Sequence, residues 1–135
     1  MADINTIAQQ FTDYYYSTFD ADRAGLAPLY RDHSMLTWEE NQIQGTAAIM
    51  EKLQASVSVV GPSRLGLPFT RVVHKVVTRD AQPGSSTVAS ILVLVTGQLI
   101  VDDGSNILQF SQMFHLVPDG GSYFVQNDVF RLVYG

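Results

Sequence analysis

The chain has 135 residues, a length that predicts one domain over residues 1–135, and it contains no cysteine, so disulfide bonds and thiolate metal sites are excluded. Eight basic residues against thirteen acidic ones give a net charge of −5, which argues against nucleic-acid binding and favours a partner that carries positive charge. The first residues lack the basic start and apolar run of a secretory signal, and the apolar stretches are too short and too interrupted to cross a membrane, so we expect no membrane association.

The first part of the chain is predicted to be mainly helical. From Asp3 to Phe19 the apolar residues recur at spacings of three and four, which predicts one helix with a single apolar stripe, and Asp3 suits its N-cap. A turn and a short second helix follow, limited in length by Pro28. The next predicted elements are a strand, a short second strand that turns back on it, and a helix that Gly45 opens: Ser34–Trp38, Gln42–Gln44 and residues 45–56.

After Pro68 the apolar pattern changes to a period of two, which predicts strands. The predicted strands cover residues 69–78, 85–106, 107–117 and 122–135, with turns at Asp103–Gly104 and at residues 118–121. Helices followed by a meander of antiparallel strands indicate an α+β domain, with the helices packed on one face of a strongly twisted sheet. A sheet that curls around those helices forms a cone with an apolar mouth, where ligands tend to bind.

Catalysis and metal binding have little support in the sequence. His33, His74 and His115 lie far apart, and no two have the spacing of zinc ligands. No nucleophile elbow, phosphate loop or dinucleotide fingerprint is present. An acid or base in an apolar pocket could come from Asp128, His74 or Tyr14. The more common roles of these three are an edge charge, a core histidine and a core tyrosine, so a pocket enzyme remains only an alternative.

The segment "MLTWEENQIQG", Met35–Gly45, sets the only tryptophan directly before Glu39 and Glu40. Tryptophan is usually mostly buried, whereas glutamate is almost never buried unless it is paired. The segment is therefore either a strand end that runs into a solvated loop, or the rim of an apolar pocket with a negative edge. A second acidic pair, Asp102–Asp103, precedes a glycine at a hairpin tip, where such residues need no function. The residues alone leave both explanations open.

Motifs along most of the chain form a specific combination: YY…FD.DR…LY…S.LTWE…QG…I.EKL, closing on NDxFRL. They lie within residues 11–53, 67–75, 80–83 and 110–132. On these motifs the chain resembles the nuclear transport factor 2 family. The resemblance implies a cone-shaped α+β fold with an apolar cavity, a homodimer formed sheet to sheet, no cofactor and no catalysis. It also implies a carrier of the GDP form of the small GTPase Ran, which binds FxFG nucleoporin repeats and moves between cytoplasm, nucleus and nuclear pore.

The resemblance also assigns residues to sites. In this family an apolar cavity accepts an aromatic side chain of Ran-GDP, and acidic residues at its rim pair with basic residues of Ran. Trp38 matches the cavity, with Tyr15 and His74 as further cavity residues. Glu39 and Asp102 match the rim carboxylates. By this comparison the indole helps to form the socket, and the neighbouring glutamate selects a basic group beside the inserted ring.

Two positions depart from the family pattern. The further acidic residue that commonly lies two positions after Asp102 is Gly104 here, and Asp103 is the candidate substitute. Nucleoporin binding in the family uses an aromatic residue seven positions before the phenylalanine of the first helix, and here that position is Ile4. Isoleucine can line an apolar groove but cannot stack on a ring.

The last strands carry more apolar bulk than one small helix layer can cover. We name Phe114 and Val129 as candidate residues of an exposed apolar sheet face, which predicts a twofold homodimer. The same fold class hosts dehydratases and isomerases, and related domains serve as protein-binding adaptors. A pocket enzyme would place an acid or a histidine inside a closed cavity, whereas a carrier would place carboxylates on the rim of an apolar one.

Overall fold

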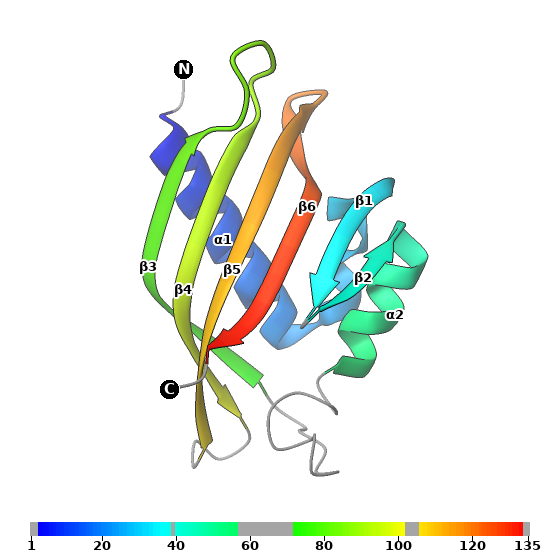
Figure 1. The fold of residues 1–135 in the computed structure, drawn as a ribbon, viewed down its shortest axis with the longest axis vertical. Coiled ribbons are helices and arrows are strands. Elements are labelled where there is room, and N and C mark those ends of the chain that lie inside the picture. Colours follow the sequence, from blue (N-terminus) through cyan, green and yellow to red (C-terminus); the bar gives the residue numbers. More distant parts are fainter. Residues whose placement is uncertain (1–2, 39, 57–71, 102–105, 134–135) are drawn as a thin grey trace.

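The computed structural model describes residues 3–38, 40–56, 72–101 and 106–133 (Figure 1). The helices are α1 (Ile4–Ala21), the short 3₁₀ helix η1 (Arg23–Leu29) and α2 (Thr46–Ser56). The strands are β1 (Tyr30–Trp38), β2 (Asn41–Gln44), β3 (Val72–Pro83), β4 (Ile91–Val101), β5 (Asn106–Asp119) and β6 (Ser122–Val133). Within the described ranges, no helix combines the length and the apolar character that a membrane crossing requires.

The strands form one six-stranded sheet in the order β2-β1-β6-β5-β4-β3. From β3 to β6 it is the predicted antiparallel meander. β1, however, pairs in parallel with β6, so the sheet is mixed, which the alternation of side chains could not reveal. β1 also begins at Tyr30 rather than at Ser34, since Tyr30 already pairs with Val125 of β6, and the register shifts between Tyr30 and Met35. Ser34 is buried within this shift, where its hydroxyl accepts from the backbone N–H of Arg31 and donates to the carbonyl of Val125.

A local irregularity in β3 and β4 bends the sheet. The register of β3 shifts between Val76 and Thr78, and Gly97 of β4 lies opposite this shift. A Cβ atom at Gly97 would lie 2.2 Å from the carbonyl oxygen of Lys75, so only glycine allows this close approach of the two backbones. Bulges increase strand twist. The long strands therefore curve around α1, which lies across one face of the sheet (Figure 1).

The core lies between that face and the helices. α1 buries one stripe, and its rings pack on Phe114 of β5: Tyr15 at 4.8 Å and Phe11 at 5.2 Å between ring centroids. α2 packs on η1 and β1 through Ile49 and Leu53, both fully buried. Full burial of such a side chain stabilises the fold by roughly 1.5–3 kcal/mol. The predicted stripe of α1 is therefore the face that holds the sheet in its curved form.

Some predicted boundaries are corrected. Residues 84–90 are a connection rather than the start of a strand, because the backbone N–H of Gly84 bonds the carbonyl of Ser90 at 2.9 Å and the Ser85 hydroxyl accepts from the backbone N–H of Thr87. In α2, Ala47 lies on the exposed side of the helix. The expected turn at residues 103–104 lies outside the described residues.

Candidate functional site

Trp38 ends β1 and is part of a stack of three aromatic rings. The parallel register of β1 and β6 sets Trp38 opposite Phe130, and the two rings lie 4.1 Å apart with planes at 11°. Phe130 in turn stacks on Phe110 of β5 at 5.7 Å. Trp38 is only 5% exposed, so the indole is fixed by packing rather than free to move. Of the two carboxylates that follow it, Glu39 lies outside the described residues.

Glu40 is an exposed residue with φ 82°, a backbone region that few non-glycine residues adopt. Its carboxylate lies 3.6 Å from the guanidinium of Arg131, and 80% of its side chain is exposed. An ion pair in solvent of this kind contributes little free energy. The structure therefore agrees with a solvated role for Glu40. The predicted rim residues Asp102 and Asp103 also lie outside the described residues.

His74 is a buried, hydrogen-bonded histidine of β3. Its Nδ1 lies 2.7 Å from Oδ1 of Asp20, and its backbone N–H donates to Oδ2 of the same carboxylate at 2.9 Å. The imidazole stacks on Tyr16 at 4.6 Å and meets Phe19 edge-on at 4.8 Å. Its side chain is 2% exposed. The contacts tie the carboxyl end of α1 to β3, which is the role of a core histidine.

Tyr15 belongs to a polar cluster at the centre of the covered face. Asp128 of β6 is fully buried, and its carboxylate accepts from Nε2 of Gln112 at 2.7 Å and from the hydroxyl of Tyr30 at 2.8 Å. Tyr15 donates to the same carboxylate at 3.3 Å, and its hydroxyl lies 2.8 Å from that of Tyr30. Tyr16 donates to Oε1 of Gln112 at 2.8 Å. The cluster thus joins α1, β1, β5 and β6 through mutually satisfied groups.

Burial sets the proton equilibria of this cluster. It raises the pKa of Asp128 from 3.8 to about 6, against the opposing effect of hydrogen bonds from Gln112, Tyr30 and Tyr15. Burial also raises the pKa of Tyr15 and of Tyr30 well above the ordinary value, and the negative charge of Asp128 adds to this effect. The tyrosines therefore remain neutral donors, while the carboxyl can bind or release a proton near neutral pH.

Two expectations from the sequence are corrected here. Asp128 is the buried centre of a cluster rather than an edge charge, and Tyr14 is 53% exposed rather than a core residue. The sequence did contain a sign that Asp128 is buried, because Asp128, Phe130 and Leu132 alternate along β6 and so share one face. For Tyr14, the predicted apolar stripe between Asp3 and Phe19 is wider than the part of α1 that the sheet covers.

The opposite face of the sheet is exposed over β4, β5 and β6. Leu94, Met113 and Val129 are aligned by register across these strands, and Leu94 and Val129 are 46% and 38% exposed. A hollow of about 260 Å³ lies beside Leu94 and Met113. Phe114 points the other way, fully buried against Phe11 and Tyr15. Phe114 is therefore a core residue, which corrects the expectation that it shares an exposed surface with Val129.

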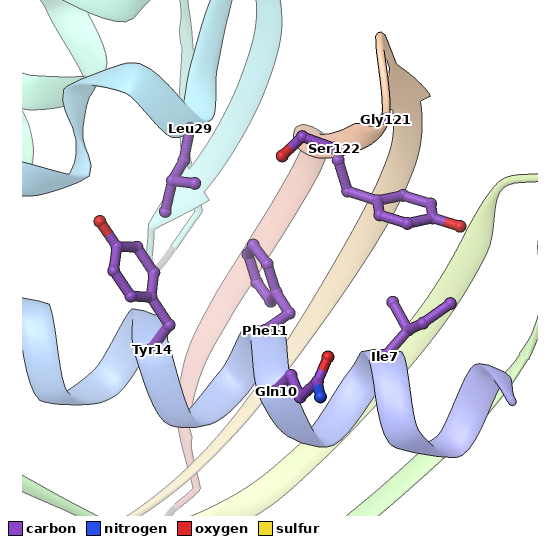
Figure 2. A pocket seen from close by; sticks show the side chains of 8 residues that line it. Ile7, Gln10, Phe11, Tyr14, Leu29, Gly121 and Ser122 are labelled. Carbon is purple, nitrogen blue, oxygen red and sulfur yellow. The ribbon is translucent and has the colours of Figure 1, made fainter. Parts of the chain in front are cut away.

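Ile4 lies in the first turn of α1 and is half-buried. One turn further along the helix, the same stripe enters a groove of about 570 Å³ that no local motif predicts (Figure 2). Its walls come from α1, the end of η1 and the β5–β6 turn. They consist of Ile7, Gln10, Phe11, Tyr14, Leu29, Gly121, Ser122 and Tyr123. Among the residues that the structure describes, no three His, Asp or Glu side chains gather as a metal site would require.

A model of the nuclear transport factor 2 (NTF2) domain matches residues 7–132. The chain belongs to the nuclear transport factor 2 family. It is 58% identical to nuclear transport factor 2 of Emericella nidulans, across 99% of this chain and 98% of that protein. Identity to nuclear transport factor 2 of Saccharomyces cerevisiae is 49%, across 98% of this chain and 96% of the yeast protein. The resemblance read from the motifs is thereby confirmed.

Solved structures agree on the fold of this family member. The structure of nuclear transport factor 2 from Cryptosporidium parvum matches with a TM-score of 0.80 and 40% identity, covering 96% of this chain and 94% of that one. A scytalone dehydratase-like structure from Novosphingobium aromaticivorans, 14% identical, matches with a TM-score of 0.75 and covers 97% and 85% of the two chains. At that identity the likeness shows the fold alone. The predicted α+β class and nuclear transport factor 2-like fold are confirmed.

The raised pKa of Asp128 predicts a pH dependence of stability. Because the carboxyl binds its proton more tightly in the folded state, its contribution is full below about pH 4 and is lost as pH rises through about 6. Each pKa unit corresponds to about 1.4 kcal/mol, so the loss reaches about 3 kcal/mol. In Asp128→Asn this dependence disappears. The free energy of urea unfolding of wild type relative to the variant should therefore fall between pH 4 and 7, at one fixed protein concentration.

The exposed residue Asp32 gives a matched control for this experiment. Asp32→Asn changes the same functional group at the surface, so its unfolding free energy should follow that of wild type at every pH. A difference between wild type and Asp128→Asn that stays constant from pH 4 to 7 would contradict the assignment.

Proposed function

We propose that the protein is a nuclear import carrier that binds the GDP form of Ran and FxFG nucleoporin repeats and moves Ran through the nuclear pore. The observation that carries this proposal is the 58% identity to a protein named nuclear transport factor 2, over nearly the full length of both chains. Membership of this family supports a role in nuclear transport rather than catalysis. The proposed locations are the cytoplasm, the nucleus and the nuclear pore complex, which contains the FxFG partners.

The proposed Ran site lies at the end of β1. The stack of Trp38 on Phe130 supports a rigid aromatic wall there, and Glu39 follows Trp38 directly in the chain. Glu39, Asp102 and Asp103 are the proposed rim carboxylates for basic groups of Ran. His74 and Tyr15 are buried, so their proposed part in the cavity is to support its shape from behind.

Modest energies suit such a carrier. Burial of an inserted phenylalanine contributes roughly 1.5–3 kcal/mol, and an exposed ion pair at the rim adds roughly 0.2–1 kcal/mol. Binding built from these contributions is reversible, so the cargo can be released. Discrimination between nucleotide states comes from the cargo, because the γ-phosphate of GTP reorders the switch segments of a GTPase.

The proposed homodimer forms through the exposed sheet face. Leu94, Met113 and Val129 form an apolar strip on three adjacent strands, where isolated apolar side chains would be the norm on a monomer. A twofold axis across the strip would set it against its own copy.

Ile4, at the start of α1, is the proposed contact for FxFG repeats. Its side chain offers the repeats an apolar surface but cannot stack on their rings.

The enzyme alternative depends on Asp128, because its raised pKa resembles that of a catalytic acid. The carboxylate, however, already accepts hydrogen bonds from Gln112, Tyr30 and Tyr15. A catalytic group must present an atom to its substrate. These internal bonds favour a structural role, and they support the proposal that the protein is not an enzyme. The adaptor alternative shares the fold but requires no discrimination between the nucleotide states of Ran.

Calorimetric titration with Ran-GDP, repeated with Ran bound to a non-hydrolysable GTP analogue, tests the carrier proposal. We expect saturable binding to the GDP form and at least about tenfold weaker binding to the other, because the reordered switch segments withdraw the inserted ring. Binding to neither form by a folded protein, or equal binding to both, would count against the proposal and favour the adaptor alternative.

Charge reversal tests the assignment of the rim. Glu39→Lys should abolish measurable Ran-GDP binding, since a lysine would repel the basic groups that Glu39 is proposed to select. Glu40→Lys is the matched control, because it makes the same charge change one residue away at an exposed position. The control should bind within about threefold of wild type. Calorimetric and circular dichroism profiles should show both variants folded, and unchanged affinity in folded Glu39→Lys would refute the role of Glu39.

Light scattering tests the dimer. Leu94→Glu places a charge in the exposed apolar strip, and burial of that charge in a sheet-to-sheet interface would be unfavourable by several kcal/mol. We expect wild type to have the mass of two chains at micromolar concentration and Leu94→Glu to have the mass of one. Ala47→Glu, on the exposed side of α2, is the control and should remain a dimer. A monomeric wild type would overturn the proposed interface.

A further inference from the structure

We propose that Asp80 on β3 of each protomer forms an ion pair with the partner's Arg131 on β6, and that the hollow beside Leu94 receives the stem of that arginine. The inference rests on the proposed dimer and adds the contact that aligns the two sheets. Its occupant is a second copy of this chain, which the charge and the shape of the uncovered face identify.

One row of residues crosses the four long strands on the uncovered face of the sheet. The register pairs Asp80 with Leu94, Leu94 with Met113, and Met113 with Val129. The strand order β6-β5-β4-β3 sets the middle of this row between β4 and β5 (Figure 1). A twofold axis that runs along the strands through this point exchanges the two ends of the row. β3 of one protomer then faces β6 of its partner.

The two ends of the row are complementary in shape. The β3 end holds the hollow of about 260 Å³, whose lining consists of Asp80, Ala81, Gln82, Leu92, Val93, Leu94 and Met113. At the β6 end the side chains of Val129 and Arg131 are exposed. Pockets for small molecules usually measure roughly 300–1,000 Å³, so a side chain from a packed protein suits this hollow better than a separate ligand. A hollow at one end and projecting side chains at the other make the face self-complementary.

Charge selects the projecting residue. Asp80 is the one charged residue in the lining of the hollow, and its exposed carboxylate has no hydrogen-bond or ion-pair partner among the described residues. β6 contains one basic residue, Arg131. An arginine stem can pack along apolar walls while its guanidinium bonds a carboxylate at the edge. The apolar walls and the single carboxylate therefore suit arginine.

The position along β6 agrees with this choice. Two aligned sheets cross at about 30°, so the partner's β6 passes Asp80 at a position displaced from Val129. The neighbours of Val129 on the same face are Asn127 and Arg131. Asn127 already bonds a histidine of β5. Arg131 lies 3.6 Å from Glu40 in an exposed pair, which contributes little and leaves the guanidinium able to turn toward a second carboxylate.

Sedimentation of oppositely charged variants of the full chain tests this pair. Asp80→Lys and Arg131→Asp each bring like charges together in a homodimer, so the dimer dissociation constant of each variant should rise at least about tenfold over wild type. In an equal mixture, the heterodimer would pair the introduced lysine with the introduced aspartate and native Asp80 with native Arg131. We expect its dissociation constant to lie within about threefold of the wild-type value.

Recovery on mixing would be specific to contact between protomers. β4 and β5 separate β3 from β6, which sets the two positions about 14 Å apart at three strand spacings, too far to pair within one chain. Glu51→Lys reverses an exposed charge on α2 and is the control for charge reversal alone. It should dimerise within about twofold of wild type. Circular dichroism should show all three variants folded.

Two outcomes would reject the ion pair while the dimer stands. Either variant might dimerise as tightly as wild type, or the mixture of folded variants might dimerise no more tightly than each variant alone. A wild type that stays monomeric at micromolar concentration would reject the proposed dimer itself, and the ion pair with it.

Discussion

The hydrogen bonds that Asp128 accepts join the four elements on which the covered face of the sheet depends. Tyr15 comes from α1, Tyr30 from β1 and Gln112 from β5, and all three donate to a carboxylate on β6. A buried carboxylate without these partners would be strongly unfavourable, so arrangements that separate the elements are disfavoured. A slip of β6 by one residue would turn Asp128 outward and expose Phe130, since side chains alternate between faces.

The position of Trp38 follows from the same register. Phe130 lies two residues after Asp128, on the same face of β6, and Trp38 stacks on it through the parallel pairing of β1 with β6. Any change that moves Asp128 therefore also moves the aromatic wall at the end of β1. The proposed cargo socket and the central polar cluster are in this sense one packing arrangement, held together by the pairing of β1 with β6.

How far the sequence predicts this molecule depends on the range of each interaction. The apolar stripe of α1 and the antiparallel meander from β3 to β6 follow from local periodicity, and both were predicted correctly from the sequence. The parallel pairing of β1 with β6 was not predicted, because the pairing of strands that are distant in the sequence produces no periodic pattern. Phe114 was placed on the wrong face, since adjacent bulky residues on β5 can point either way until the helix that covers one face is known. The groove combines Ile7, Leu29 and Ser122, which are distant in sequence and which no local motif marks.

The fold separates the proposed binding surfaces along α1. With 18 residues the helix is about 27 Å long. Its amino-terminal half and the β5–β6 turn lie at one end of the sheet, whereas β1 runs toward the other end, where Trp38 lies (Figure 1). The exposed strip around Leu94 occupies the face that α1 does not cover. A carrier must hold its cargo while it contacts successive partners. Surfaces at opposite ends and on opposite faces would let each proposed partner bind without displacing the others.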